Sequence, residues 1–231
     1  MRLDELTSER FAECVKGNPL VILPLGATEA HGPHLPLGTD TFQPEYIVSV
    51  IDKELNDKVI IAPTLPYGQH STARNVSGTI DLSFDTLRSV IRDILNAFIR
   101  HGIKRIMIIS GHAGTSHMTA VTEACRETAE LNPVDIIFFS DFYIAADCEI
   151  PGTEGDGHAG MIETSRMLHI RPDTVTKERP IGTYRQFGYR VLGDARACLP
   201  EGVSGNTKNA SSDIGKKINE FIIKSIKEMI S

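Results

Sequence analysis

Residues 85–109, DTLRSVIRDILNAFIRHGIKRIMII, contain the pattern that decides the fold. Apolar residues recur every three or four positions over 85–101, which predicts an amphipathic helix with one buried stripe. Gly102 is typical of a residue that ends a helix, and the short apolar run within 104–109 then predicts a buried strand. Such runs are typical of a parallel sheet that is covered on both faces, because neither side of the strand meets water.

Similar pairs of elements extend along the rest of the chain. We expect helices over 4–16, 41–55, 85–101, 116–131, about 160–169 and 212–230, and strands over 19–25, 59–62, 104–109 and 134–139. Thr39 or Asp40 could cap the helix over 41–55. Because strands alternate with helices and no linker or internal repeat interrupts them, we predict one α/β domain over residues 1–231. Its sheet should be mostly parallel and lie between two layers of helices.

The composition excludes several classes of protein. Of the 231 residues, 41% are hydrophobic and 23% are charged, as in ordinary globular proteins. The formal net charge of −6 provides no basic surface for nucleic acid, and no apolar run is long enough to span a membrane. The four cysteines show no CxxC spacing, so neither a zinc knuckle nor a redox pair is indicated. We therefore expect a cytoplasmic protein that acts on a small molecule, without nucleic-acid or membrane partners.

Two loops that directly follow expected strands, called strand exits below, contain most of the residues that are suited to catalysis or metal binding. LPLGATEAHGPHLPLGTD, residues 23–40, follows the first expected strand, and SGHAGT, residues 110–115, follows the third. In open α/β sheets ligands bind beyond the carboxyl ends of the strands, so both stretches should meet at one edge. Glu29, His31 and Asp40 offer two carboxylates and one imidazole, a set that suits Zn²⁺, Mn²⁺ or Fe²⁺.

The same residues also have structural interpretations. Asp40 could simply cap a helix, and Glu29 could be a solvated loop acid. His112 could project from its strand end as a metal ligand, or the SGHAGT loop around it could bind a phosphate at the following helix N-terminus. The loop matches neither of the common nucleotide-binding patterns. His34 is a weaker ligand candidate, and His117 is more typical of a structural or surface histidine.

Two further segments carry candidate residues. In GDGHAGMIETS, His158 and Glu163 lie on either side of a loop-to-helix junction, although Glu163 could equally be an exposed helix acid. The polar segment over 66–83 contains Tyr67 and Ser71 but no spacing that is typical of metal ligands. We therefore expect that segment to contribute substrate contacts at most.

Taken in order, these segments resemble the motifs of the creatininase (creatinine amidohydrolase) family. The family motif P-x-G-[SA]-x-E-x-H-G-x-H-L-P-x-x-T-D is matched nearly position for position by PLGATEAHGPHLPLGTD, residues 24–40. The family motif H-A-G-x-x-E-T-S is complete at residues 158–165, and a YG…GTI segment and a closing Gly-rich segment also agree. The resemblance spans most of the chain. It implies a three-layer α/β/α fold, hydrolysis of an amide bond and a homo-oligomer, by resemblance a hexamer.

The resemblance further implies a centre of two divalent ions, with Zn²⁺ expected first and Mn²⁺ or Fe²⁺ as alternatives. Carried over by motif, Glu29 and His112 would hold one ion and His31 the other, with Asp40 bridging both. A metal-bridging hydroxide would then attack the carbonyl of a small cyclic amide or a formamide. The alternative is a non-catalytic module that binds a phosphorylated small ligand at the SGHAGT loop.

The departures from the family motifs limit the substrate assignment. Gly114 stands where creatininase proper has an acid two positions after the motif histidine, so Glu163 is the expected replacement. His158 would be the catalytic proton shuttle, and Tyr67 and Ser71 would contact the substrate. The chain has no tryptophan, although creatininase proper is expected to cover its flat substrate with aromatic residues that include it. The sequence therefore indicates a creatininase-like branch rather than creatininase proper.

Overall fold

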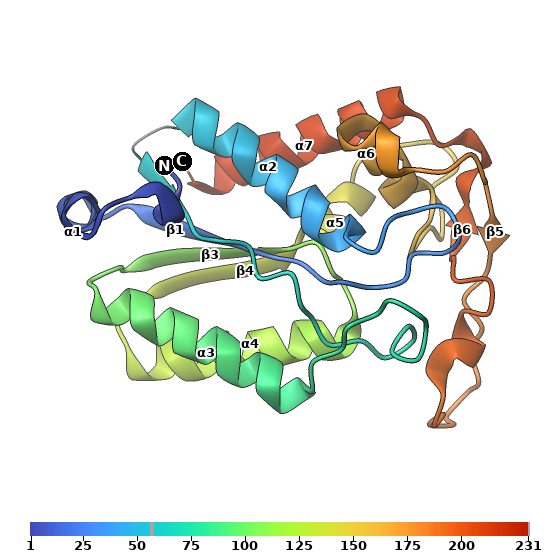
Figure 1. Ribbon diagram of the computed structural model, residues 1–231, viewed down its shortest axis with the longest axis horizontal. Helices are drawn as coiled ribbons and strands as arrows, with labels where there is room; N and C mark the ends of the chain where they lie inside the picture. Colours follow the sequence, from blue (N-terminus) through green and yellow to red (C-terminus); the bar gives the residue numbers. More distant parts are fainter. Residues whose placement is uncertain (56–57, 231) are drawn as a thin grey trace.

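The central sheet consists of four parallel strands, in the order β2-β1-β3-β4. The strands are β1 (Leu20–Leu25), β2 (Val59–Ile61), β3 (Arg105–Ser110) and β4 (Asp135–Ser140). The computed structural model describes residues 1–55 and 58–230, and β1, β3 and β4 cross the middle of the molecule in Figure 1. All four expected strands form, and each begins and ends within one residue of its expected bounds.

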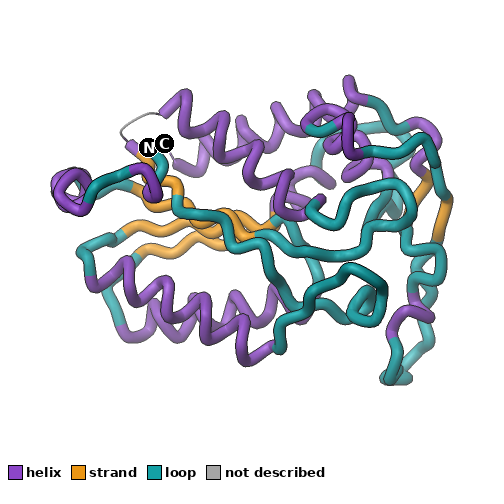
Figure 2. The backbone as a smooth tube through the Cα atoms, viewed as in Figure 1, coloured by secondary structure: helices purple, strands orange, loops and turns teal. Residues whose placement is uncertain are grey.

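Two layers of helices cover the two faces of this sheet (Figures 1 and 2). One layer contains α2 (Thr39–Leu55), α5 (Asp141–Ala146), α6 (Met161–Ile170) and α7 (Ser212–Ile230). The other layer contains α3 (Phe84–Arg100) and α4 (Thr115–Leu131). The predicted class, an α/β fold with a parallel sheet between helices on both faces, is confirmed.

The strands contribute to a separate hydrophobic core on each face, because successive side chains of a strand point in opposite directions. Ile22 and Met107 pack in a cluster with buried residues of α2 and α7. Val21 and Ile106 pack in the other cluster, with buried residues of α3 and α4. All six residues of β1 are buried, which explains why an uninterrupted apolar run encodes this central strand.

The expected helix over 4–16 is wrong at its start. A 3₁₀ turn, η1 (Leu3–Glu5), is followed by a separate helix, α1 (Ser8–Lys16). The Thr7 side chain accepts a hydrogen bond from the backbone N–H of Arg10 and so caps α1. The apolar spacing does not reveal this break, because Leu3 before it and Phe11 after it both pack against the same core.

The expected cap of α2 is also wrong. The helix begins at Thr39, so both Thr39 and Asp40 lie in its first turn. The hydroxyl of Thr39 donates to the carbonyl of Pro36, 2.8 Å away, outside the helix. Asp40 is therefore free to point its carboxylate towards the strand exits instead of towards the helix N–H groups.

Several short elements were not expected from the sequence. The helix α5 begins directly after β4, with Ser140 as its cap. No loop residues mark the start of this helix in the sequence. The remaining elements are η3 (Pro172–Thr174), β5 (Ile181–Gly182), η4 (Ala195–Cys198), β6 (Gly205–Asn206) and η5 (Thr207–Asn209). Within the described ranges, no helix combines the length and the apolar character that a membrane span requires.

The strand order creates a switch point between β1 and β3. The chain leaves β1, crosses α2 to β2 on one side, and returns through α3 to β3 on the other side. The loops after β1 and β3 consequently meet at the crevice where ligands bind in such sheets. Their backbones are in contact: a Cβ at Gly111 would lie 2.0 Å from the carbonyl oxygen of Asp40, so only glycine fits there.

Candidate metal centre

Asp40 lies between two imidazoles that come from the two strand exits. Its Oδ1 is 2.9 Å from Nε2 of His31, and its Oδ2 is 3.0 Å from Nδ1 of His112. All three side chains are buried. A carboxylate whose two oxygens face two separate imidazoles has the arrangement of a ligand that two ions can share.

Two more carboxylates flank this group, one on each side. The Oε2 of Glu29 is 3.1 Å from Nδ1 of His112, and the Oε2 of Glu163 is 3.9 Å from Nε2 of His31. The backbone N–H of Ala159 donates to the same oxygen of Glu163 and fixes that side chain. The structure therefore brings together the five residues that the sequence and its resemblance single out as ligands, namely Glu29, His31, Asp40, His112 and Glu163.

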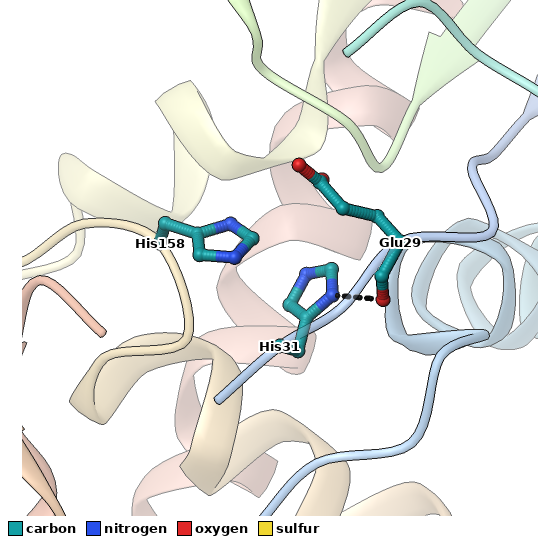
Figure 3. Close-up of side chains that lie close together, drawn as sticks. All are labelled: Glu29, His31 and His158. Carbon is teal, nitrogen blue, oxygen red and sulfur yellow. Dashed lines mark hydrogen bonds between the residues drawn. The ribbon is translucent and has the colours of Figure 1, made fainter. Parts of the chain in front are cut away.

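Backbone carbonyls orient both imidazoles, and once the rings are neutral they favour one tautomer of each. Nδ1 of His31 donates to the carbonyl oxygen of Glu29, 3.0 Å away (Figure 3). This leaves Nε2 to face Asp40. Nε2 of His112 donates to the carbonyl oxygen of Gln69, 3.2 Å away, which leaves Nδ1 to face the carboxylates. A second hydrogen bond of this kind is what orients a metal-binding histidine.

The charges of the cluster are balanced by protons that a cation can replace. Burial raises the pKa of Glu163 to about 8, so this acid keeps its proton at neutral pH. Burial alone would lower the pKa of His31, but the carboxylate of Asp40 raises it to about 10. Burial also opposes ionisation of Asp40, yet its two histidine neighbours hold its pKa well below the usual range. A divalent ion could take the place of these protons, since ligands must be deprotonated to bind it.

Among the described residues, three groups of side chains could each hold a metal ion. Within each group the ligand atoms lie within 4.8 Å of one another, and the groups share Glu29 and His31. The groups are Glu29, His70 and His112; His31, Asp40 and Glu163; and Glu29, His31 and His158. The Oε2 atom of Glu29 is buried and faces His112, but no residue of the described part of the chain gives it a hydrogen bond of good geometry. A buried carboxylate oxygen that lacks a hydrogen-bond donor and lies beside imidazole nitrogens is available as a ligand for a cation. The mixed N and O donors suit Zn²⁺, Mn²⁺ or Fe²⁺.

His158 lies over the same cluster, on the loop before α6 (Figure 3). Its ring centroid is 4.3 Å from that of His31, and its Nε2 donates to the carbonyl oxygen of Ala30, 2.9 Å away. Burial, together with the positive charge of His31, lowers the pKa of His158. The ring is therefore neutral at pH 7, and its Nδ1 is left as the proton acceptor.

A cavity of about 250 Å³ opens onto these groups. Its wall includes Phe142, Tyr143 and Tyr184, which sequence reasoning missed because no spacing links α5 or the segment after β5 to the strand exits. Tyr67 and Ser71 are not among the described residues that line it, whereas the neighbouring Thr72 is, so their substrate contacts stay a prediction. His70 is a further residue that the sequence did not assign: it is buried with its Nδ1 3.4 Å from Oε1 of Glu29.

The remaining two histidines near the exits have protein partners. Nε2 of His34 lies 2.8 Å from the hydroxyl of Thr164. His117 accepts the backbone N–H of Gln69 at Nδ1 and lies 3.2 Å from the hydroxyl of Ser110 at Nε2. Burial lowers the pKa of His117 well below its usual range. His117 therefore has the surroundings of a structural histidine, whereas Nδ1 of His34 has no hydrogen-bond partner among the described residues.

Hydrogen bonds at its start and a buried ion pair hold α6, the helix that carries Glu163. The carboxylate of Asp156 accepts hydrogen bonds from the backbone N–H groups of the first two residues of α6, both at 2.8 Å. Arg166 forms an ion pair with Asp141 at 2.6 Å and donates to Asn219 on α7 at 2.9 Å. Because the side chains of the ion pair are 0% exposed, this pair links α6 to α5 inside the core.

His34 should make the stability of the protein depend on pH. Burial lowers its pKa to about 4, so the folded protein resists protonating it while the unfolded chain takes up a proton near pH 6.5. Stability from this group is fully present above pH 6.5 and is lost as the pH falls towards 4, by up to about 2 kcal/mol. Urea unfolding of the wild type and of H34Q at several pH values measures this difference.

The variant H101Q, at an exposed position, controls for the loss of a histidine as such. The stability gap between wild type and H34Q should shrink on acidification, whereas the gap between wild type and H101Q should not. A gap for H34Q that stays constant from pH 7 to pH 4.5 would contradict the buried, neutral state of His34.

A parallel α/β sheet with a buried carboxylate–imidazole cluster at its switch point defines an α/β protein with a candidate metal centre. The chain belongs to the creatininase family: the profile of that family, described as creatinine amidohydrolase, matches residues 4–230. The expected family membership is therefore confirmed.

Individual relatives agree with this membership. The chain is 27% identical to a creatinine amidohydrolase of Pseudomonas putida, over 98% of this chain and 94% of the relative. It is also 27% identical to a mycofactocin precursor peptide peptidase of Mycobacterium tuberculosis, over 93% and 85% respectively. Among solved structures, one described as "Creatininase Mn" superimposes with a TM-score of 0.88, at 24% identity over 99% of this chain and 96% of that chain. The chain is thus a creatininase-family hydrolase with metal-binding groups of residues.

Proposed function

We propose that this protein is a dinuclear metal-dependent hydrolase that cleaves a C–N bond of a small cyclic amide or a formamide. The observation that carries the proposal is the position of Asp40, whose two carboxylate oxygens face His31 and His112. In this proposal Glu29 and His112 hold one ion, His31 and Glu163 hold the other, and Asp40 is shared. Zn²⁺ is the expected ion, with Mn²⁺ or Fe²⁺ as alternatives.

When bound, two such ions supply an activated water and polarise a carbonyl group. The chain's own contribution to proton transfer comes from His158. Its Nε2–H is held by the carbonyl oxygen of Ala30, so the ring cannot turn away, and its Nδ1 can take up a proton. Because its pKa is lowered by burial, His158 can also release that proton to the leaving nitrogen.

The size of the site supports a small substrate. The cavity over the cluster has a volume of about 250 Å³, and a neighbouring cavity of about 260 Å³ shares Thr72, His158 and Leu199 with it. The relatives at 27% identity include both a creatinine amidohydrolase and a peptide peptidase, so family membership leaves the substrate open. Creatinine itself is not proposed, because the chain lacks the tryptophan that the family resemblance leads us to expect over that substrate, and Phe142, Tyr143 and Tyr184 line the cavity instead.

Metal analysis combined with a substrate screen tests the proposal. Protein purified without chelator should contain close to two transition-metal ions per chain. Cyclic amides, formamides and short peptides should be screened for release of amine or carboxylate, with and without chelator. We expect hydrolysis of a cyclic amide or formamide that stops when the ions are removed and resumes when Zn²⁺, Mn²⁺ or Fe²⁺ is added. Metal-free protein that hydrolyses the same compound at the full rate would contradict the proposal.

The alternative, a module that binds a phosphorylated ligand at the SGHAGT loop, is disfavoured by the charges around that loop. The side chain of His112 faces the carboxylates of Glu29 and Asp40 at 3.0–3.1 Å. These acids would repel a phosphate group. A metal-free protein that binds phosphate or nucleotides tightly would favour the module instead.

The other expectations from the sequence stay predictions. They are a single domain over residues 1–231, a cytoplasmic location and a homo-oligomer, which is a hexamer by family resemblance. The roles of Tyr67 and Ser71 in substrate contact belong with them. None is needed for the argument from Asp40.

A further inference from the structure

We propose that His70 is a ligand of the ion that Glu29 and His112 hold, so that this ion is bound by two imidazoles. The inference rests on the proposed function, because it assumes that the cluster binds metal. His70 lies on the segment between β2 and α3, which no family motif described above assigns to the metal centre. The expected ligand set from the strand exits and α6 does not include it.

The backbone around His70 is fixed at the edge of the cluster. The N–H of His70 donates to Oδ1 of Asp81 at 2.7 Å, and its carbonyl oxygen accepts from the side chain of Gln69 at 2.9 Å. The carbonyl of Gln69 in turn holds Nε2 of His112. The carbonyl of Gln69 thus orients His112, one proposed ligand, and the residue after Gln69, His70, has its side chain beside Glu29.

The ring of His70 lacks the partners that a structural histidine has. It is 1% exposed, and neither of its ring nitrogens has a hydrogen-bond partner among the residues that the structure describes. Buried polar atoms are nearly always paired, and an ion bound at Nδ1, the nitrogen that faces Glu29, would supply one of the two missing partners. His117 gives the internal comparison: it is equally buried and lies against the same His112 ring, yet both of its nitrogens have protein partners.

The distances between these side chains also fit ligation of one ion. Nδ1 of His70 is 3.4 Å from Oε1 of Glu29, and Oε2 of Glu29 is 3.1 Å from Nδ1 of His112. Two ligands bonded at about 2.0–2.1 Å to one tetrahedral ion are roughly 3.3 Å apart. The atoms of His70, Glu29 and His112 are therefore spaced as neighbouring ligands of one ion are spaced.

With His70 included, the two proposed ions have different surroundings. The first would have two imidazoles, Glu29 and a shared Asp40, whereas the second would have one imidazole, from His31, with Glu163 and the shared Asp40. Nitrogen-rich sites favour Zn²⁺, and oxygen-rich sites are better suited to Mn²⁺. The first ion should accordingly be the tighter Zn²⁺ site, and the second should exchange more readily with Mn²⁺.

The test measures Zn²⁺ binding to the full chain after metal removal, by competition with a chromophoric chelator. In H70Q, which keeps most of the side-chain volume, we expect one of the two Zn²⁺ affinities to fall by roughly 100-fold, since loss of a ligand should exceed the effect of losing an orienting group. The other affinity should stay nearly unchanged. The matched control is H117Q, which removes a buried imidazole from the same neighbourhood and should cost at most about tenfold.

Cobalt provides a second readout that does not depend on activity. The visible absorption of bound Co²⁺ reports the number and type of its ligands, so H70A should change the spectrum of one site. Free imidazole added to H70A should restore the wild-type spectrum by entering the space that the side chain leaves. H117Q should keep the wild-type spectrum.

The outcomes separate this inference from the proposed function. If the wild type binds two ions and H70Q retains both at wild-type affinity, His70 is not a ligand, although the dinuclear centre stands. An equal loss in H70Q and H117Q would likewise overturn the assignment, since packing would then explain it. A wild type that binds no metal would overturn the proposed function and the role of His70 together.

Discussion

The variant D40N should lose at least one of the two proposed ions and should reduce the proposed hydrolysis by roughly 10³-fold or more. Loss of a group that merely orients a ligand already costs about 10–100-fold, and Asp40 is proposed to contact both ions directly. The amide keeps the shape of the side chain but removes the negative charge that now faces His31 and His112. Elemental analysis of metal content and steady-state rates on the same preparation measure both effects.

Asp93 offers the matched control for this experiment. It lies on α3, and its side chain is largely exposed, so D93N makes the same chemical change away from the cluster. We expect D93N to keep full metal content and activity. If D40N also kept both ions and the full rate, the shared ligand would be assigned wrongly and the dinuclear mechanism would lose its main support.

The variant R166M should lower the free energy of unfolding by about 3–5 kcal/mol, because it leaves the carboxylate of Asp141 buried without its partner. The amide of Asn219 would lose its donor as well. Urea unfolding in the presence of a chelator measures this effect without a contribution from bound ions. Because α6 carries Glu163, a smaller loss of metal affinity should accompany the loss of stability.

The double variant D141L/R166M provides the control for the charge. Replacing both members of a buried pair by apolar side chains is often nearly neutral, so the double variant should recover most of the stability that R166M loses. A double variant that is as unstable as R166M would mean that packing volume, and not the unpaired carboxylate, determines the cost.

Much of the fold could be predicted because it depends on local patterns. Each strand is a short apolar run, and the stripe over 85–101 is continuous, so strands and long helices could be assigned within a residue or two. Glu29, His31, Asp40 and His112 could be placed together because parallel strands end at one edge of a sheet. Their closeness follows from topology and needs no knowledge of side-chain packing.

The rest depends on contacts between segments that no spacing connects. His70 reaches Glu29 from a loop that returns from β2, and its unpaired nitrogens are visible only in three dimensions. Tyr143 and Tyr184 reach the cavity from α5 and from the segment after β5. Thr7 interrupts the first expected helix through a single side-chain hydrogen bond, which the apolar pattern does not encode.

The contact between Gly111 and the carbonyl of Asp40 joins the two strand exits without room for a side chain. The full set of ligands consequently exists only after β1 and β3 have paired and α6 has docked. A partly folded chain would offer an ion little more than the carboxylates and imidazole of the first exit, so bound ions would favour the complete fold by mass action. Metal supply in the cell would then set how long each copy of this protein survives unfolding and proteolysis.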